Sequence, residues 1–310
     1  MICKFIYQGC DVFTRFNNIY MDNPFQINYP DQVDAGLVKL AIGGDKQALQ
    51  NLVIRHQIFV YNLALKMTRS VEDAEDLTQE VFIKAITALS KFEGKSQFRT
   101  WLYRITVNHF LNSKKRKPEL EVTGFETYFN SIDDMPVYEL SNQEQADLTE
   151  SIEELRISCT AGMLLCLDRE QRIIYILGEM FGIDHNLGSE ILGITVGNFR
   201  IRLMRARQDL YNWMNDRCGL VNKSNPCRCA KKTRAYIEAG YVDPNNLKFN
   251  TRYKKIIYEL SQEKAVSISN TVEDLHKTIF LHHPLQEPLT TAKIVDKIFN
   301  NNLIKLILNS

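Results

Sequence analysis

The sequence predicts an all-α protein with two small helical domains, an acidic linker between them and a helical C-terminal extension. Apolar residues recur at helical spacing through most of the chain, and no segment shows the alternation of a β-strand. The 310 residues, 45% hydrophobic and 24% charged, suffice for two domains with buried cores. No uninterrupted apolar run approaches the ~20 residues that cross a bilayer, so we expect no membrane insertion.

The N-terminal residues and the cysteines indicate a compartment. Charged side chains interrupt the first thirty residues at Lys4, Asp11, Arg15 and Asp22, which excludes the apolar core of a signal peptide. Seven cysteines, an odd number, without such a signal are typical of a reducing compartment rather than of a disulfide framework. We therefore expect a cytoplasmic protein. Met21 opens a more ordinary N-terminus than Met1 and is a second candidate start.

The net charge of +1 conceals a sorting of charges along the chain. Residues 91–117 are basic and contain only Glu93 as an acidic residue, whereas residues 118–154 are acidic without a lysine or arginine. Basic residues return at 200–207 and 228–234. Two basic blocks around an acidic connector favour two modules that face a polyanion. The alternative for either block alone is a solvated helix face.

Helical spacing and capping residues predict the first domain over residues 34–117. A short helix precedes a break at Gly43, and Asp45 caps a second helix. Ser70 begins a third helix as a capping box, in which its side chain accepts from a backbone N–H and Asp73 reaches back. A fourth helix is predicted from about Phe98 to Lys115, and the following proline, residue 118, ends the domain.

Residues 159–217 are predicted as a helix-turn-helix domain. A small residue, Ser189, allows two helices to approach, Gly193 suits the turn, and Thr195 caps the second helix. That helix has a buried stripe of Phe199, Leu203, Ala206 and Leu210. Its other faces carry four residues that could contact the base edges and phosphates of DNA: Asn198, Arg200, Arg202 and Arg205. An ordinary helical hairpin with a solvated arginine face is the alternative.

Two motifs of the first domain carry a family resemblance. They are Asp-Ala-Glu-Asp-Leu-Thr-Gln-Glu-Val-Phe-Ile-Lys-Ala at 73–85 and Phe-Arg-Thr-Trp-Leu-Tyr-Arg-Ile-Thr-Val-Asn at 98–108. With the helix-turn-helix following in the same order, the chain closely resembles bacterial RNA polymerase sigma factors of the extracytoplasmic-function (ECF) group, over about residues 36–117 and 160–216. The resemblance implies a protein that directs RNA polymerase to specific promoters and initiates DNA-templated transcription, with no enzymatic activity and no cofactor.

The resemblance also implies partners and their contact residues. In the family, the helix matching 73–85 docks on a basic coiled coil of the largest polymerase subunit, which implies contacts to core RNA polymerase by Asp73, Asp76, Gln79 and Glu80. The following segment opens the minus-ten promoter element and holds the melted non-template strand, which implies DNA contacts by Phe92, Lys95, Phe98, Arg99, Lys114, Lys115 and Arg116. The second domain would read the minus-thirty-five element in duplex DNA. An anti-sigma factor is a further candidate partner.

The remaining segments are an N-terminal extension (1–33), an acidic linker (118–158) and a Cys-containing loop with a helical extension (218–310). By analogy, the linker threads through the polymerase. Cys218, Cys227 and Cys229 could hold zinc with a fourth ligand such as His282 or His283, or could sense oxidants. We expect no metal, because only one tight cysteine pair exists and plain packing is favoured. Cys159 and Cys166 are expected in the core.

Three alternatives remain for testing. An autonomous helix-turn-helix regulator would bind duplex DNA without polymerase, but the aromatic and basic segment at 92–117 argues against it. A metal-dependent hydrolase is weaker still, because Asp73, Asp76 and Glu80 lie on a helix flank with no neighbouring histidine or nucleophile motif in the sequence. The helical extension could fold back on the DNA-binding domains and regulate them, or it could complete a core.

Overall fold

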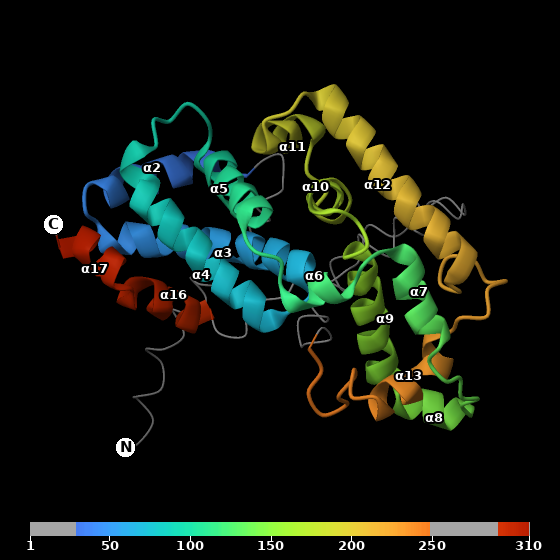
Figure 1. The fold of residues 1–310 in the computed structure, drawn as a ribbon. Helices are drawn as coiled ribbons and strands as arrows, with labels where there is room; N and C mark the ends of the chain where they lie inside the picture. The colour runs from blue at the N-terminus through green and yellow to red at the C-terminus, as the bar shows by residue number, and fades with distance from the viewer. Residues whose placement is uncertain (1–28, 249–290, 310) are drawn as a thin grey trace, which may run out of the picture.

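The computed structural model describes residues 29–248 and 291–309, which form helices and loops without a β-strand (Figure 1). The predicted all-α class is confirmed. None of the helices in these two ranges is both long and apolar enough to span a bilayer. The candidate start Met21, part of the predicted helical extension (249–290), and the candidate ligands His282 and His283 lie outside the described residues.

The first domain packs three helices around a long, almost fully buried one. The central helix is α3 (Lys46–Thr68), and its neighbours are α2 (Asp31–Ile42), α4 (Val71–Ala88) and α5 (Phe98–Asn112). A single 3₁₀ turn, η1 (Leu89–Lys91), ends α4. The apolar residues of this domain and part of the second domain form one continuous core.

The predicted caps of the first domain are confirmed with one exception. Asp45 Oδ1 accepts from the N–H groups of Gln47 and Ala48 at 2.8 and 3.0 Å. Ser70 Oγ accepts from the N–H of Asp73 at 3.1 Å, but the expected return bond from Asp73 is wrong. The Ser70 N–H instead donates to the hydroxyl of Thr68 at 3.4 Å.

The second domain contains the predicted helix-turn-helix. Helix α9 (Thr149–Leu164) leads into α10 (Arg169–Tyr175), which continues as a π-helical turn, η2 (Ile176–Met180). The motif itself is α11 (His185–Leu192) followed by α12 (Val196–Arg217). Gly193 has φ 65°, and Thr195 Oγ1 accepts from the N–H of Asn198 at 3.2 Å, as the sequence predicts.

The close approach of α11 and α12 requires Gly188, the neighbour of Ser189. A Cβ on Gly188 would lie 2.6 Å from the ring of Phe199, so only glycine fits without movement of that ring. Ser189 is buried, and its hydroxyl donates to the carbonyl of Asn186 at 2.8 Å. The residue that weakens α11 in isolation is therefore required for the packing of the motif.

Residues 118–158, expected as a linker, include three short helices. They are most of α6 (Lys117–Glu121), then α7 (Phe125–Asp133) and α8 (Asn142–Asp147). Beyond the helix-turn-helix, α13 (Cys229–Glu238) packs against α9. The buried ammonium of Lys232 donates to the carbonyls of Ile132 and Met135 at 2.6 and 2.8 Å, which fastens α13 to the end of α7.

A buried charge cluster joins the linker to both domains. Glu119 on α6 accepts from Arg169 at 2.7 and 2.9 Å and from Arg172 at 3.0 Å. The two arginines also donate to carbonyls at the ends of α3, α5 and α9. Helix α5 ends at Asn112 rather than at the predicted Lys115, because Arg169 donates to the carbonyls of Ser113 and Lys114.

We expect Glu119→Gln to lower the free energy of unfolding by about 3 kcal/mol, because it leaves two buried guanidinium groups without a carboxylate. Glu121→Gln on the same helix is the matched control. Glu121 is exposed and forms an ion pair with Lys117 at 3.8 Å, so its loss should cost under about 0.5 kcal/mol. Urea unfolding of both variants measures the difference, and equal stabilities would remove the cluster from its structural role.

The lowered pKa of Glu119 should make the stability of the fold depend on pH. Burial alone would raise the pKa of Glu119, but hydrogen bonds from Arg169 and the Arg116 N–H and the charge of Arg172 outweigh it and lower the pKa. Since the unfolded value is about 4.3, the stabilisation is complete above about pH 5 and is lost as the pH falls through the folded-state value. In Glu119→Gln this part of the acid-induced loss of stability should be absent.

Candidate protein and nucleic-acid interfaces

The acidic helix α4 presents a mixed polar face. Asp76 and Glu80 are exposed, whereas Asp73 and Gln79 are half-buried. Asp73, Asp76 and Glu80 share one side because they are three and four residues apart, and Gln79 lies at the edge towards Phe82. The cap at Ser70 begins the helix so that Asp73 stands in its first turn, where a carboxylate is favoured by the helix dipole.

The structure brings Arg116, predicted as a DNA contact, to this acidic face. Its guanidinium lies 3.6 Å from the Asp73 carboxylate and 3.8 Å from that of Glu80. His109 Nε2 is 2.9 Å from Glu80 Oε2, and Lys84 Nζ donates to His109 Nδ1 at 2.6 Å. His109 and Lys84 were not among the predicted site residues, although the Glu80–Lys84 spacing of four residues is a helix-pair signal.

Electrostatics keep His109 in its neutral form. Burial is the largest effect and lowers the pKa of His109, and the Lys84 ammonium lowers it further. The Glu80 carboxylate opposes both without reversing them. At pH 7 the imidazole is therefore an acceptor for Lys84, and the positive charge beside Glu80 comes from Lys84 and Arg116.

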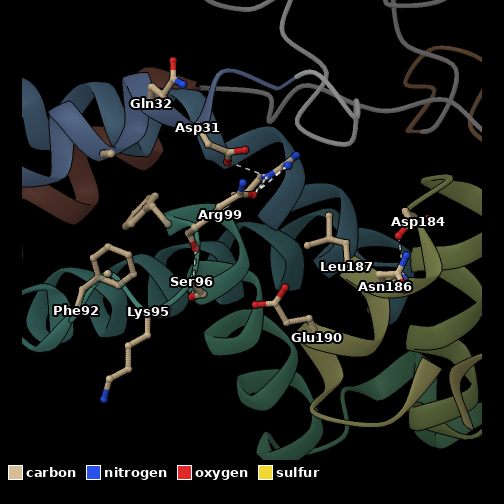
Figure 2. A pocket seen from close by; sticks show the side chains of 14 residues that line it. Asp31, Gln32, Phe92, Lys95, Ser96, Arg99, Asp184, Asn186, Leu187 and Glu190 are labelled. Atoms are coloured by element: carbon tan, nitrogen blue, oxygen red, sulfur yellow. Dashed lines mark hydrogen bonds and ion pairs between the residues drawn. The ribbon is translucent and has the colours of Figure 1, made fainter. Parts of the chain in front are cut away.

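The segment that follows α4 lines an open pocket of about 930 Å³ (Figure 2). Residues 94–99 form one wall with Asp31 from α2, and α11 forms the opposite wall with Leu187 and Glu190. The pocket thus lies between the segment predicted to hold melted DNA and the first helix of the helix-turn-helix. Its lining combines the aromatic rings of Phe92 and Phe98, which suit stacking on a nucleobase, with charges of both signs: Lys95 and Arg99 beside Asp31, Asp184 and Glu190.

Two predicted DNA contacts at this pocket are held inside the domain. Arg99 is 6% exposed and forms an ion pair with Asp31 at 2.9 Å. Its guanidinium carbon lies over the Tyr29 ring, 5.1 Å from the ring centroid. Phe98 is 7% exposed and packs on Trp101 and His56 with centroid distances of 5.7 and 5.3 Å. Their DNA contacts stay predictions, and Asp31, which holds Arg99, was not anticipated.

Other predicted contacts are accessible. Phe92 is half-buried at the pocket edge, 5.2 Å from the Trp101 ring. Lys95 is 84% exposed and points away from the pocket, where it pairs with Glu93. Lys114 and Lys115 are exposed beyond the end of α5. In α5, Leu102 is fully buried, whereas Trp101 and Ile105 are half-buried against the apolar core.

Helix α11 docks the second domain on the first. It packs against α5 and α12, and Arg104 on α5 donates to the Glu190 carbonyl at 2.7 Å. The Glu190 carboxylate lies 3.7 Å from the same guanidinium. In this arrangement the two modules form one body, with α12 on the outside (Figure 1).

The recognition helix α12 has the predicted buried stripe and a partly engaged polar face. Arg202 forms an ion pair with Glu170 at 2.6 Å and donates to Asn198, and Arg200 donates to His185 at 3.1 Å. Arg205 is exposed and has no ion-pair partner in the part of the chain that the structure describes. Ile201 and Met204 beside it are 49% and 54% exposed. Met204 was not anticipated as part of this face.

The cysteines of the C-terminal segment gather around Cys159. A small cavity is lined by Cys159 of α9 together with Cys218, Cys227 and Cys229, a convergence that the sequence did not predict. Burial raises the pKa of all four thiols, that of Cys229 to about 12. Within the described ranges, no group of three or more His, Cys, Asp or Glu residues is placed to hold a metal ion. Cys166 lies apart from this cavity and is half-buried.

Comparison with known proteins gives concordant results. The family model for Sigma-70 region 2 matches residues 52–118. The RNA polymerase sigma-H factor of Pseudomonas aeruginosa is 31% identical over 179 residues, 56% of this chain and 90% of the relative. The ECF RNA polymerase sigma-E factors of Escherichia coli K12 and Salmonella typhimurium LT2 are each 33% identical over 183 residues, 58% of this chain and 93% of the relatives.

A solved structure, that of CnrH in complex with the cytosolic domain of CnrY, aligns with 22% identity and a TM-score of 0.41, covering 59% of this chain and 98% of that chain. The helical fold, the acidic helix and the helix-turn-helix define a promoter-recognition protein of transcription initiation. Because sigma factors at least 30% identical are matched over nine-tenths of their length, the chain belongs to the ECF group of RNA polymerase sigma factors.

The thiols of this cavity should be alkylated slowly in the native protein. At pH 8, Cys218, Cys227 and Cys229 should react with iodoacetamide at least about tenfold more slowly in the native protein than after denaturation, because a raised pKa removes the nucleophilic thiolate. Mass spectrometry of timed samples gives each rate. Native labelling of Cys229 as fast as in the denatured chain would show that the cavity does not protect this thiol.

Proposed function

We propose that this sigma factor binds core RNA polymerase through α4, holds the melted minus-ten element with residues 92–117 and reads the minus-thirty-five element with α12. The observation that carries the proposal is that the first domain has an acidic face on α4 and, on a separate segment, the exposed lysines of residues 92–117 with Phe92 at the edge of a pocket. An autonomous regulator of duplex DNA needs neither surface. Sigma factors act by binding, so the proposal contains no catalytic step and no cofactor.

The polymerase contact centres on Asp76 and Glu80. Both carboxylates are exposed on α4, and they offer acceptors to the lysines and arginines of a basic coiled coil. Gln79 would add a neutral hydrogen-bonding group beside them. Asp73 contributes as the half-buried member of the face, already near Arg116.

The minus-ten contact divides into phosphate and base contacts. Lys95, Lys114 and Lys115 are exposed and suited to phosphates, whereas Phe92 at the pocket edge is placed to stack on a base. Phe98 and Arg99 would join only if DNA displaced the Trp101 and Asp31 contacts that hold them. The pocket also requires α11 to move away if the melted strand is to pass through it.

The minus-thirty-five contact uses the outer face of α12. Arg205 supplies an exposed guanidinium, and the neighbouring Ile201 and Met204 offer apolar contact to thymine methyl groups in a major groove. Asn198, Arg200 and Arg202 complete the predicted set, with two of the arginines now paired within the domain. The promoter elements lie tens of ångströms apart on duplex DNA, so α11 must leave α5 when both are bound.

Reconstituted transcription tests the proposal as a whole. Purified protein added to sigma-free core polymerase on a genomic promoter library should produce discrete transcription start sites that are absent without it. Aligning these sites would give the sequences of both promoter elements. Binding to duplex DNA without any binding to core polymerase would instead support the autonomous regulator.

We expect Asp76→Arg to weaken core-polymerase binding at least about 30-fold, or ~2 kcal/mol, because it places a cation against a basic partner. The circular-dichroism spectrum should be unchanged, since Asp76 is exposed. Asp216→Arg, an exposed position near the end of α12, is the control and should bind normally. Unchanged affinity of the Asp76 variant would remove α4 from the interface.

We expect Arg205→Ala to weaken minus-thirty-five binding by ~1–3 kcal/mol. A loss confined to particular base pairs would identify base readout, whereas a uniform loss with a shallower salt dependence would identify a phosphate contact. Arg217→Ala, at the far end of α12 and paired with Asp133, is the control. Fluorescence anisotropy on mutated duplexes at several salt concentrations separates these outcomes, and no loss at all would exclude Arg205 from the DNA interface.

A further inference from the structure

The C-terminal helices are part of the first domain's core. Helix α16 (Thr291–Asn300) packs against α3 and α4, and α17 (Asn302–Asn309) packs against α4 (Figure 1). Ile294, Ile298 and Ile304 are each at most 2% exposed and join the same apolar cluster as α3 and α4. The end of the chain therefore returns to the helix that carries the proposed polymerase contacts.

The neighbours of α4 on its two flanks indicate where α16 and α17 pack. One flank carries Glu80 and Lys84, where His109 and Arg116 lie against it. The opposite flank carries Phe82 and Ile86, which are buried. Phe82 and Ile86 belong to the same apolar cluster as Ile294, Ile298 and Ile304, α16 also packs against α3, and the first flank is occupied. We infer from this that α16 and α17 lie on the flank of Phe82 and Ile86. Gln79 precedes these two residues by three and seven positions and stands at the border of the same flank.

Charge favours this placement. Residues 291–309 contain three lysines, at 293, 297 and 305, and one acidic residue, Asp296. The facing helix contains Glu72, Glu75, Asp76 and Glu80 in addition to Asp73. A basic, amphipathic helix pair thus covers an acidic helix, which is the same charge relation that the proposed function requires of the polymerase.

We propose that α16 and α17 form a tethered competitor for core RNA polymerase: they cover the Phe82–Ile86 flank of α4 and must leave it before the polymerase coiled coil can dock. This inference rests on the proposed function. Packed helices have axes 8–10 Å apart, and α4 is a single helix about 10 Å wide. Asp76 and Glu80 stay exposed with the pair in place, but a coiled coil is two helices, about 20 Å, wide, so one that also reaches Gln79 would extend over the flank that α16 and α17 cover.

The test compares buried and exposed positions of this helix pair in the full chain. Ile298→Asp places a carboxylate in the buried contact and should release the pair, so that affinity for core polymerase rises at least about tenfold, the factor by which a ten-to-one closed state lowers it. Leu306→Asp introduces the same group at a position 71% exposed and should bind like the unmodified chain. Ile304→Asp on α17 should repeat the effect of Ile298→Asp.

Hydrogen exchange on the unmodified chain provides a measurement that does not depend on the folding of a variant. The amides of α16 should be protected in the free protein and should lose protection when core polymerase is added. Retained protection in the complex would overturn the proposal, as would equal polymerase affinity of Ile298→Asp and the unmodified chain. Failure of all chains to bind polymerase would overturn the proposed function itself, and the inference with it.

Discussion

Two arginines at the start of α10 donate hydrogen bonds to the carbonyls at the C-terminal ends of three helices, which come from both domains. Arg172 donates to Met67 on α3 and Leu164 on α9, and Arg169 donates to Phe110 on α5. Terminal carbonyls carry the negative end of each helix dipole and have no partner within their own helix. Guanidinium groups satisfy several of them at once, and Glu119 balances the buried positive charge. The relative positions of α3, α5 and α9 depend on this cluster.

The functional surfaces follow from that junction. Since α10 is anchored on the first domain, the helix-turn-helix that continues from it is carried to α5, where α11 meets Arg104. The outer face of α12 then points away from the first domain, and the pocket at 94–99 is left between α11 and α2. The acidic face of α4, the pocket at 94–99 and the outer face of α12 thus lie on different elements, and α11 holds α12 to the first domain.

Local interactions could be predicted from the sequence, and long-range ones could not. Asp45, Gly193 and Thr195 act within a few residues of their own position, so spacing and residue type were sufficient. The partners of Arg99 and Arg116 are set by tertiary packing, and no local pattern indicates them. The cavity shared by Cys159 and the C-terminal cysteines, and the position of α16 on α4, likewise depend on which helices meet. Gly188 lowers the helix propensity of α11, and only its packing against Phe199 explains why a glycine stands there.

The pairing of Arg116 with Asp73 and Glu80 changes what a basic partner gains on reaching α4. Docking there exchanges ion pairs within the chain for ion pairs between chains, instead of creating them from fully hydrated carboxylates. Exposed pairs are each worth under about 1 kcal/mol, so such an exchange is close to neutral in free energy. Charge on this helix would then select the partner and its orientation, and most of the binding strength would have to come from apolar contact.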